Sequence, residues 1–428
     1  MRVERGATSL PHSRRVCLAC VILLLTVPLA GCSGTLGTVE PASIRFACFN
    51  YDRAYYEPLV QEFSAAHPQI TVELVPLPDD AWRRQLSLLE GVDTFVASST
   101  LLGDLLEDGR ILNLDPFIEQ DETFDAADFY PGVLENLSAE GKTWAVPAGL
   151  DPMVMYYNKD LFDQYGAPYP ASGWTWDDFM NIVLAMRDPD AGIYGYATVL
   201  GVFDVLPFIY QHGGQLALDL KNVAGATFGD PVNIEALQWY VDLIHEHEAI
   251  PTPEQARRAF GGSDYRVAQG FLTNKVGMIV LPFSQRGGQG WPTQWQMRWG
   301  MVPLPRDARS ATIVTVEGYF ISAQTQHPEA CWQWIAFLSR KMPTRLVPPR
   351  RSLVESDAYR LLVGEDVAGV VRAAAGSDVL LLQPSDMPQQ AQQAFEILQR
   401  ALESAIAGSV TPEEALSEAQ RQVEALGQ

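Results

Sequence analysis

Apolar runs of strand length alternate with helical patterns in the first part of this chain, and this alternation limits the fold more than any other feature. The runs typical of buried strands are SIRFACF (43–49), ITVELVP (70–76) and DTFVAS (93–98). The segments with apolar residues at helical spacing are YYEPLVQEFSAAHP (55–68), DAWRRQLSLLEG (80–91) and LLGDLLEDGRI (101–111). Strand–helix repeats of this kind predict a parallel sheet covered by helices on both faces. The unit is too short for the whole chain, so we interpret it as the first lobe of an α/β protein.

A break in the pattern follows in EGKTWAVPAGLDPMVMYYNKDLF. Pro147 and Gly149 interrupt an apolar arm, and MVMYYN (153–158) resumes as a strand. We interpret this break as a crossover from one lobe to another. Further strand-like segments are TIVTV (312–316) and GYFISAQ (318–324).

Helix-start and helix-face patterns complete the outline. Thr175 and Asp178 have the spacing of a capping box, and the flanking Trp174 and Trp176 are expected to pack inside a lobe. Near the C-terminus, Phe395 lies on the apolar stripe of a helix, together with Leu398, Leu402 and Ile406. We therefore expect Phe395 to favour core packing.

The N-terminal segment has the pattern of a targeting signal and is set apart from the fold. Its start is basic, and the apolar stretch from Val16 to Pro28 is too short for a permanent transmembrane helix. Leu-Ala-Gly-Cys at 29–32 resembles a bacterial lipobox. The resemblance implies that residues 1–31 are a lipoprotein signal peptide. Acyl chains on Cys32 would anchor the mature chain to a membrane, with residues 32–41 as a lipidated tether.

Charge and cysteine usage exclude several classes of function. The formal net charge is −22, which repels nucleic acid, so no nucleic-acid partner is expected. No histidine pair has the spacing of a helical zinc site, and no phosphate-binding or nucleophile motif is present, so we expect no metal and no cofactor. Cys48 and Cys331 lie in apolar segments. Export would permit a disulfide between them, but we favour two buried free thiols.

An ordered series of motifs across residues 29–426 resembles the extracellular solute-binding proteins of ABC importers, family 1, which include maltodextrin-binding protein. The series comprises the lipobox, FNYD (49–52), EDGRILNLDPFIEQD (107–121), GKTWAVPAGLDPMVMYYNKDLF (141–162), GWTWDDF (173–179), VGMIVLPF (276–283), VPLPR (302–306), EGYFIS (317–322), HPEACWQWIAFLS (327–339) and TPEEALSEAQ (411–420).

The resemblance implies a two-lobed, type II periplasmic-binding-protein-like α/β fold, each lobe a mainly parallel sheet flanked by helices and hinged by crossover segments. By analogy the N-lobe comprises 42–149 plus 300–348, and the C-lobe comprises 152–298 plus 350–428. The implied function is that of a non-catalytic, monomeric lipoprotein. It would capture a sugar or oligosaccharide in the interlobe cleft and deliver it to the transmembrane subunits of an ABC permease. The lipid would hold it on the outer face of the cytoplasmic membrane, or on the periplasmic side in a two-membrane envelope.

Carbohydrate sites combine aromatic rings, which stack on pyranose faces, with polar side chains that bind hydroxyl groups. The resemblance implies polar contacts at strand ends and crossovers, at Asn50, Tyr51, Asp52, Ser99, Asp151, Glu317, Gly318 and Tyr319. It also implies aromatic contacts at Phe203, Phe283 and Phe395. Trp82, Trp291 and Arg351 are added because they lie in loops or at element ends near the expected cleft edges.

Three alternatives remain open from the residues. An exported glycoside hydrolase would also have aromatic rings and carboxylates in a cleft, but it needs a carboxyl pair at a fixed separation. A sensory or adhesive lipoprotein could bind a solute without feeding an importer. A receptor for a glycerophosphodiester or another phosphorylated polyol could use Arg350 and Arg351 to bind phosphate.

Overall fold

The computed structural model describes residues 41–426 apart from 79–84, 217–224, 264, 290, 292–293 and 383–388. Pro41–Gln428 form one compact unit, and all that follows concerns this unit. Cys32 and Trp82 of the predicted set lie outside the described residues. None of the described helices is long and apolar enough to cross a membrane.

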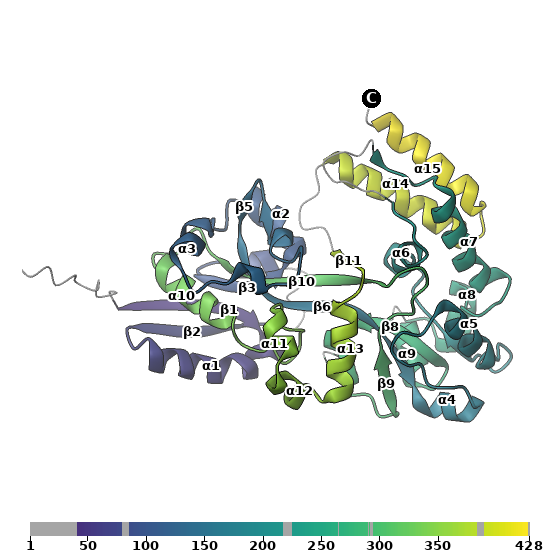
Figure 1. Ribbon diagram of the computed structural model, residues 1–428, viewed down its shortest axis with the longest axis horizontal. Helices are drawn as coiled ribbons and strands as arrows, with labels where there is room; N and C mark the ends of the chain where they lie inside the picture. The colour runs from purple at the N-terminus through teal and green to yellow at the C-terminus, as the bar shows by residue number, and fades with distance from the viewer. Residues whose placement is uncertain are drawn as a thin grey trace, which may run out of the picture. The chain divides into compact units, whose positions relative to one another are not determined.

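A nine-stranded mixed sheet runs through the unit in the order β2-β1-β3-β10-β6-β8-β7, with β11 paired to β10 and β9 to β6 (Figure 1). Its strands are β1 (Ala42–Phe49), β2 (Ile70–Leu77), β3 (Thr94–Ser98), β6 (Ala145–Asn158), β7 (Tyr194–Tyr196), β8 (Val276–Pro282), β9 (Trp299–Val302), β10 (Ala311–Ile321) and β11 (Val379–Leu382). A small separate sheet pairs β4 (Ser138–Ala139) with β5 (Lys142–Thr143).

The helices, including short 3-10 turns labelled η, cover this sheet. The α-helices are α1 (Arg53–Ala66), α2 (Leu102–Glu107), α3 (Asp115–Gln120), α4 (Lys159–Tyr165), α5 (Trp176–Ala185), α6 (Val202–Gln211), α7 (Pro231–His245), α8 (Pro253–Phe260), α9 (Arg266–Leu272), α10 (Pro328–Leu338), α11 (Arg351–Glu355), α12 (Asp357–Val363), α13 (Glu365–Ala375), α14 (Gln389–Ile406) and α15 (Pro412–Leu426). The 3-10 turns used below are η1 (Asn50–Asp52), η3 (Gln85–Leu88), η4 (Ser99–Leu101) and η8 (Phe283–Gly288).

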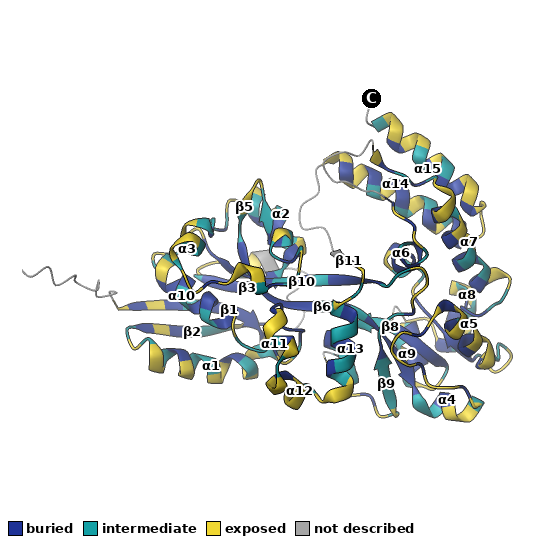
Figure 2. Ribbon diagram, in the orientation of Figure 1, coloured by how far each residue is buried: buried dark blue, intermediate teal, exposed yellow. Residues whose placement is uncertain are grey.

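Two long strands join the parts of the sheet. The start of β6 pairs with β10, whereas its end, from Met153 to Tyr157, pairs with β8. The end of β10, from Glu317 to Ile321, also pairs with β3. Both strands are mostly buried along their length (Figure 2). They therefore connect the strands near the N-terminus, β1 to β3, with the strands β7 to β9.

The break expected at Pro147 and Gly149 is wrong, because β6 is one continuous 14-residue strand. Gly149 does not end the strand. It permits a close approach, since a Cβ atom there would lie 2.5 Å from Leu346 Cδ1. The neighbouring Leu150 and Val347 exchange backbone hydrogen bonds of 2.9 and 2.8 Å. The two segments 312–316 and 318–324 likewise join in one strand, β10, which ends at Ile321 and has a register shift between Glu317 and Gly318.

Separate apolar clusters build the core on either side of the two long strands. One contains β1, α1 and α10 residues such as Phe46, Phe63 and Trp334, and another lies around Phe95 and Phe320. The others lie around α5 to α7 and around α8 and α9. Helix α13 contributes to two of them, with Ala368 and Val371 in the Phe95 cluster and Val370 and Ala374 in the cluster of α8 and α9.

Several local expectations are confirmed. Thr175 and Asp178 form the predicted capping box of α5, with the Asp178 amide donating to Thr175 Oγ1 at 3.2 Å and the Thr175 amide donating to Asp178 Oδ2 at 2.9 Å. Trp174 and Trp176 are buried in the core. Cys48 and Cys331 are buried free thiols. The helix expected at 80–91 is described only from Gln85, where the chain forms the single turn η3.

Candidate functional site

The candidate site lies where three chain segments meet: β6, β10 and the proline-rich segment 343–349. Leu150 of β6 forms a bridge with Val347, and β10 pairs with β6 beside it. This meeting point brings the side chain of Arg345 between the carboxylates of two other elements. Asp52 comes from η1, directly after β1, and Glu317 comes from β10.

Arg345 binds both carboxylates. Its Nε donates to Asp52 Oδ1 at 3.1 Å, and its Nη2 donates to Glu317 Oε1 at 2.7 Å and to Asp52 Oδ2 at 3.1 Å. The three side chains are 12% (Asp52), 17% (Arg345) and 15% (Glu317) exposed, so they reach the surface from a largely desolvated position. Charge-assisted hydrogen bonds of this kind are strong and fix the geometry of a guanidinium.

Tyr51 adds an exposed aromatic ring to this group. It stacks on Phe49, with ring centroids 5.1 Å apart and an interplanar angle of 10°. The Arg345 guanidinium carbon lies 5.0 Å from the Tyr51 ring centroid, and Tyr51 is 42% exposed. We refer to Tyr51, Asp52, Glu317 and Arg345 as the Arg345 cluster. It combines an aromatic ring with polar groups whose positions are fixed, which is the chemistry that a polyhydroxylated ligand needs.

A small hollow of about 10 Å³ is lined by Asp52, Glu317 and Arg345 of the cluster and, among others, by Tyr55 and Tyr319. Such a volume holds at most about one water molecule. The Tyr55 hydroxyl is buried and has no hydrogen-bond partner among the described residues. The hollow is therefore too small to hold a sugar.

Asp151 lies close enough to the cluster to interact with Arg345 and Glu317. It accepts two hydrogen bonds from Ser284, one from the backbone amide at 2.8 Å and one from Oγ at 2.6 Å. Burial raises the pKa of Asp151 to about 6, although the bonds from Ser284 and the charge of Arg345 oppose that rise. Burial also raises the pKa of Asp52, against the opposing effect of Arg345. Burial acts to lower the pKa of Arg345, but the charges of Glu317 and Asp52 together outweigh it and raise that pKa, so the guanidinium stays charged.

Of the predicted site residues, the structure brings Tyr51, Asp52, Asp151 and Glu317 together. Asn50 is exposed at the start of η1, beside them in sequence. Tyr319 lines the small hollow from within the core. Gly318 has a packing role, because a Cβ atom there would lie 2.9 Å from Ala145 Cβ.

Other predicted residues lie apart from the Arg345 cluster or are buried. Phe283 is fully buried in the core, with the Arg286 guanidinium carbon 4.1 Å from its ring centroid, so it offers no exposed aromatic platform in this structure. The Ser99 side chain is also buried, and its hydroxyl has no hydrogen-bond partner among the described residues. Trp291 packs edge-on against Trp295 and donates from Nε1 to Gln285 Oε1 at 2.8 Å. The three side chains are placed by packing within the fold, and this packing cannot be derived from the sequence alone.

Phe203 and Phe395 form a second aromatic pair, on α6 and α14. Their ring centroids are 5.9 Å apart. Phe203 is 41% exposed, whereas Phe395 is partly buried against the core, as its helical position favoured. Arg351 donates to the carbonyl oxygen of Ala127, which is not part of the Arg345 cluster.

Two arginines of this site were not predicted from the sequence. Arg345 follows Pro343 and Thr344 in PTRLVPP, and the proline-rich composition signals an extended crossing segment. Arg286 lies in QRGGQG, which reads as a plain loop. Neither residue has a local signal for its role, because their partners lie far away in sequence; Asp52 and Arg345 are 293 positions apart.

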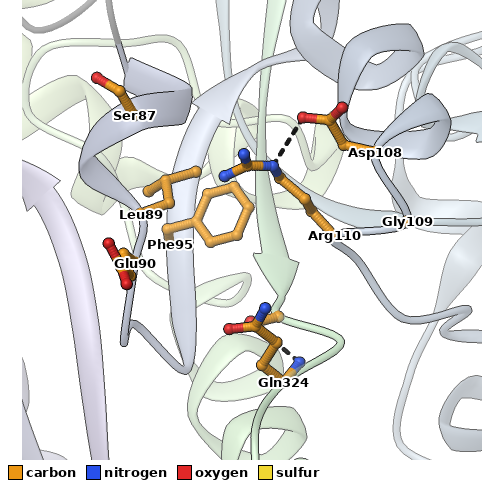
Figure 3. A pocket seen from close by; sticks show the side chains of 9 residues that line it. Ser87, Leu89, Glu90, Phe95, Asp108, Gly109, Arg110 and Gln324 are labelled. Carbon is orange, nitrogen blue, oxygen red and sulfur yellow. Dashed lines mark hydrogen bonds and ion pairs between the residues drawn. The ribbon is translucent and has the colours of Figure 1, made fainter.

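A larger hollow of about 440 Å³ lies at the other end of β3. Figure 3 shows Phe95 at its centre, with Arg110, Asp108 and Gln324 around it. Arg110 Nε donates to Asp108 Oδ2 at 2.8 Å. Phe95 pairs with Phe320, whereas Ser98 pairs with Glu317 at the Arg345 cluster. The two places are therefore separated by about 10 Å along the strand.

Comparison with known proteins identifies the family of the chain. The family profile described as bacterial extracellular solute-binding protein matches residues 50–342. The chain belongs to this family. Curated relatives include the arabinooligosaccharide-binding protein of Bacillus subtilis, 26% identical over 62% of this chain and 61% of that protein. Another is the mannitol-binding protein of Pseudomonas aeruginosa, 28% identical over 43% of this chain and 40% of that protein.

Solved structures of solute-binding proteins have the same fold. An ABC substrate-binding protein from Listeria monocytogenes in complex with cycloalternan superposes with a TM-score of 0.70 and 19% identity, covering 90% of this chain and 99% of that chain. The sugar-binding protein MalE from Xanthomonas citri gives a TM-score of 0.68 with 21% identity, covering 90% of this chain and 97% of that chain. The predicted two-lobed, periplasmic-binding-protein-like α/β fold is confirmed.

Proposed function

We propose that this protein captures an uncharged sugar, sugar alcohol or oligosaccharide at the Arg345 cluster and delivers it to an ABC permease. The observation that carries the proposal is the position of Arg345 between Asp52 and Glu317, beside the exposed ring of Tyr51. The ring supplies a stacking face, and the charged groups have unshared donors and acceptors at their exposed edges for hydroxyl groups. The names of the relatives, which bind arabinooligosaccharides and mannitol, support this class of ligand.

The balance of charge favours an uncharged ligand over a phosphorylated one. Two carboxylates surround the single guanidinium of Arg345, and Asp151 lies nearby, so a phosphate group would be repelled. The arginines considered for phosphate have other partners. Arg350 donates to the carbonyl oxygens of Ser339 and Asp125, and Arg351 donates to that of Ala127. We therefore place the phosphorylated polyol second.

Transport requires no chemical step by the protein. A ligand that binds a closed arrangement of the lobes better than an open one shifts the population towards closure, which a permease can recognise. In this proposal the lobes comprise 42–149 plus 300–348 and 152–298 plus 350–428. The Phe203–Phe395 pair, on the second of these lobes, is proposed as the opposing aromatic contact.

Thermal unfolding of the chain from Ser33 onward tests the ligand class. The panel comprises mannitol, maltose, maltotriose and arabinotriose, with glycerol 3-phosphate as the anionic probe. A ligand at 100 times its Kd stabilises the folded state by about 2.7 kcal/mol, which a melting curve resolves. We expect at least one uncharged compound to raise the Tm and glycerol 3-phosphate to have no effect. The reverse result would remove the carbohydrate assignment and leave the family assignment intact.

The lipid anchor is proposed from the resemblance of Leu-Ala-Gly-Cys to a lipobox. In membrane fractions of cells that express the full chain, we expect the protein in the membrane pellet. Cys32→Ser should remove the acylation site and its lipid-dependent mass increase, while Ser33→Ala serves as the matched control. An unlipidated wild-type chain would contradict the proposal.

A further inference from the structure

One short turn contacts two of the three segments that meet at the candidate site. This turn, η8, follows β8 and has six residues, Phe283–Gly288. Ser284 binds both carboxylate oxygens of Asp151 in β6. Arg286 reaches the segment 343–349, where its Nη1 donates to the carbonyl oxygen of Arg345 at 2.8 Å and its Nη2 donates to that of Thr344.

The local structure explains why Arg286 points in this direction. Phe283 is fully buried and carries the guanidinium above its ring. Arg286 Nη1 also donates to the carbonyl oxygen of Phe283 at 3.1 Å. The next residue, Gly287, has φ of 64°, a conformation that favours glycine and turns the chain away. The planar guanidinium therefore lies between a ring and three carbonyl oxygens, which fixes its orientation.

Arg286 donates to two backbone carbonyl oxygens, that of Arg345 itself and that of the preceding residue, Thr344. A bond to the carbonyl oxygens of Thr344 and Arg345 restrains the backbone from which the Arg345 side chain projects. That side chain must then reach two carboxylates and the Tyr51 ring at once. A shift of the backbone by about 1 Å is enough to break hydrogen bonds of this length.

We propose that Arg286 is a positioning residue for ligand binding: it fixes the backbone at Thr344 and Arg345 so that the Arg345 guanidinium lies between Asp52 and Glu317. It contacts no ligand itself. The consequence for affinity rests on the proposed function, whereas the consequence for Arg345 does not. The two consequences can therefore be tested separately.

Labelling of carboxyl groups with a water-soluble carbodiimide and glycine ethyl ester tests the position of Arg345 without a ligand. Asp52 and Glu317 should react slowly in the wild type, because both are paired and mostly buried. The labelling rate of Asp52 and Glu317 in Arg345→Ala serves as the reference for carboxylates that have lost their arginine partner. We expect Arg286→Ala to raise the labelling of both residues at least about threefold towards that rate, and Arg286→Lys to have a smaller effect, because lysine lacks the planar fork.

Arg350→Ala is the matched control. Arg350 also donates to two carbonyl oxygens and lies 4.2 Å from a phenyl ring, that of Phe129, but these partners belong neither to the Arg345 cluster nor to the segment 343–349. We expect it to lower the Tm while Asp52 and Glu317 label as in the wild type. Wild-type labelling in Arg286→Ala or, if that variant does not fold, in Arg286→Lys would overturn the proposal.

Titration calorimetry with the sugar that raises the Tm in the panel above tests the effect on binding. We expect Arg286→Ala to weaken the affinity about tenfold, Arg286→Lys to restore part of it and Arg350→Ala to leave it unchanged. Increased labelling with unchanged affinity would overturn the role in binding. If no sugar binds the wild type, the proposed function fails, and the labelling result still decides whether Arg286 positions Arg345.

Discussion

Arg345 lies in the proline-rich segment 343–349 and Arg350 directly follows that segment; the two side chains have the same chemistry, but their surroundings differ. Arg345 pairs with two carboxylates at a partly exposed position beside an exposed ring. Arg350 is 4% exposed, donates to carbonyl oxygens and lies above the buried ring of Phe129. The first arrangement leaves hydrogen-bonding capacity at the surface for a ligand, whereas the second uses it within the fold. The partners of an arginine, more than its place in sequence, therefore separate a binding group from a structural one.

The largest effect on stability is expected at Arg350. Arg350→Ala removes a buried cation, takes the donor from the carbonyl oxygens of Ser339 and Asp125 and leaves Asp128 without its ion-pair partner, which should lower the free energy of unfolding by about 3 kcal/mol. Urea unfolding followed by circular dichroism measures the change. A loss below about 1 kcal/mol would show that the burial of Arg350 contributes little.

The next effect concerns pH and the carboxyl group of Asp151. Its pKa is about 6 in the folded protein and 3.8 in the unfolded reference, so the folded state binds the proton more tightly. The contribution of this carboxyl group to the free energy of unfolding is fully present below about pH 4 and is lost as the pH rises through about 6. Between these limits the free energy of unfolding falls by about 3 kcal/mol. We expect the wild type to gain more stability than Asp151→Asn between pH 7.5 and pH 5 in thermal melts. Asp121 and Asp128 have lowered pKa values and act at lower pH, so they do not mask the difference.

The same pH experiment distinguishes the two arginines. The charge of Arg345 lowers the pKa of Asp151, so Arg345→Ala should move its titration upward, whereas Arg350→Ala should leave it in place. Carbon-detected NMR of labelled aspartate carboxyl groups follows the titration directly. An unchanged Asp151 titration in Arg345→Ala would show that the two groups are not coupled.

Arg345→Ala should affect stability less than Arg350→Ala but abolish binding. Asp52 and Glu317 are mostly buried but reach the surface, so water can hydrate their edges once the guanidinium is removed, and we expect a loss of about 1–2 kcal/mol in unfolding free energy. Affinity for the sugar identified in the panel should fall by about 100-fold or more, since two carboxylates would be left without their cation. Retained affinity in this variant would place the ligand elsewhere, and the hollow around Phe95 would then be tested next.

The smallest effect on stability is expected at Tyr51. Because its ring is 42% exposed, Tyr51→Ala should change the free energy of unfolding by less than about 1 kcal/mol while weakening sugar binding about tenfold. Tyr51→Phe keeps the ring and should keep most of the affinity. If the phenylalanine variant bound as weakly as the alanine variant, the hydroxyl group and not the ring face would carry the contact.

The layers of the fold could be predicted from the sequence because strand and helix periods are local properties. The alternation in residues 43–111 and the capping box at Thr175 are of this kind. The capping box agrees with the structure, and so does the alternation except at 85–91, where the chain forms only the 3-10 turn η3 in place of the expected helix. The interruption expected at Gly149 was wrong because its cause is not local. The glycine makes room for Leu346, which lies almost 200 positions later in the chain.

The candidate site could be predicted only in part, for the same reason. Tyr51 and Asp52 directly follow β1, and Asp151 and Glu317 are single acidic residues within the mostly apolar strands β6 and β10, so all four are conspicuous in the sequence. Phe283 has an equally conspicuous position, yet it is buried beneath Arg286. Arg345 could not be chosen over Arg350 or Arg351, since only the folded chain shows which of the three meets the carboxylates.

The contact between Gly149 and Leu346 offers a way to engineer the protein without altering the groups proposed to bind ligand. With so little space between these two residues, a single methyl group at position 149 would act as a wedge between β6 and the proline-rich segment. Gly149→Ala would therefore push the two segments apart, and adding Leu346→Ala would remove the steric clash. The pair would allow the resting separation of these segments to be adjusted, as in the design of an optical sugar sensor.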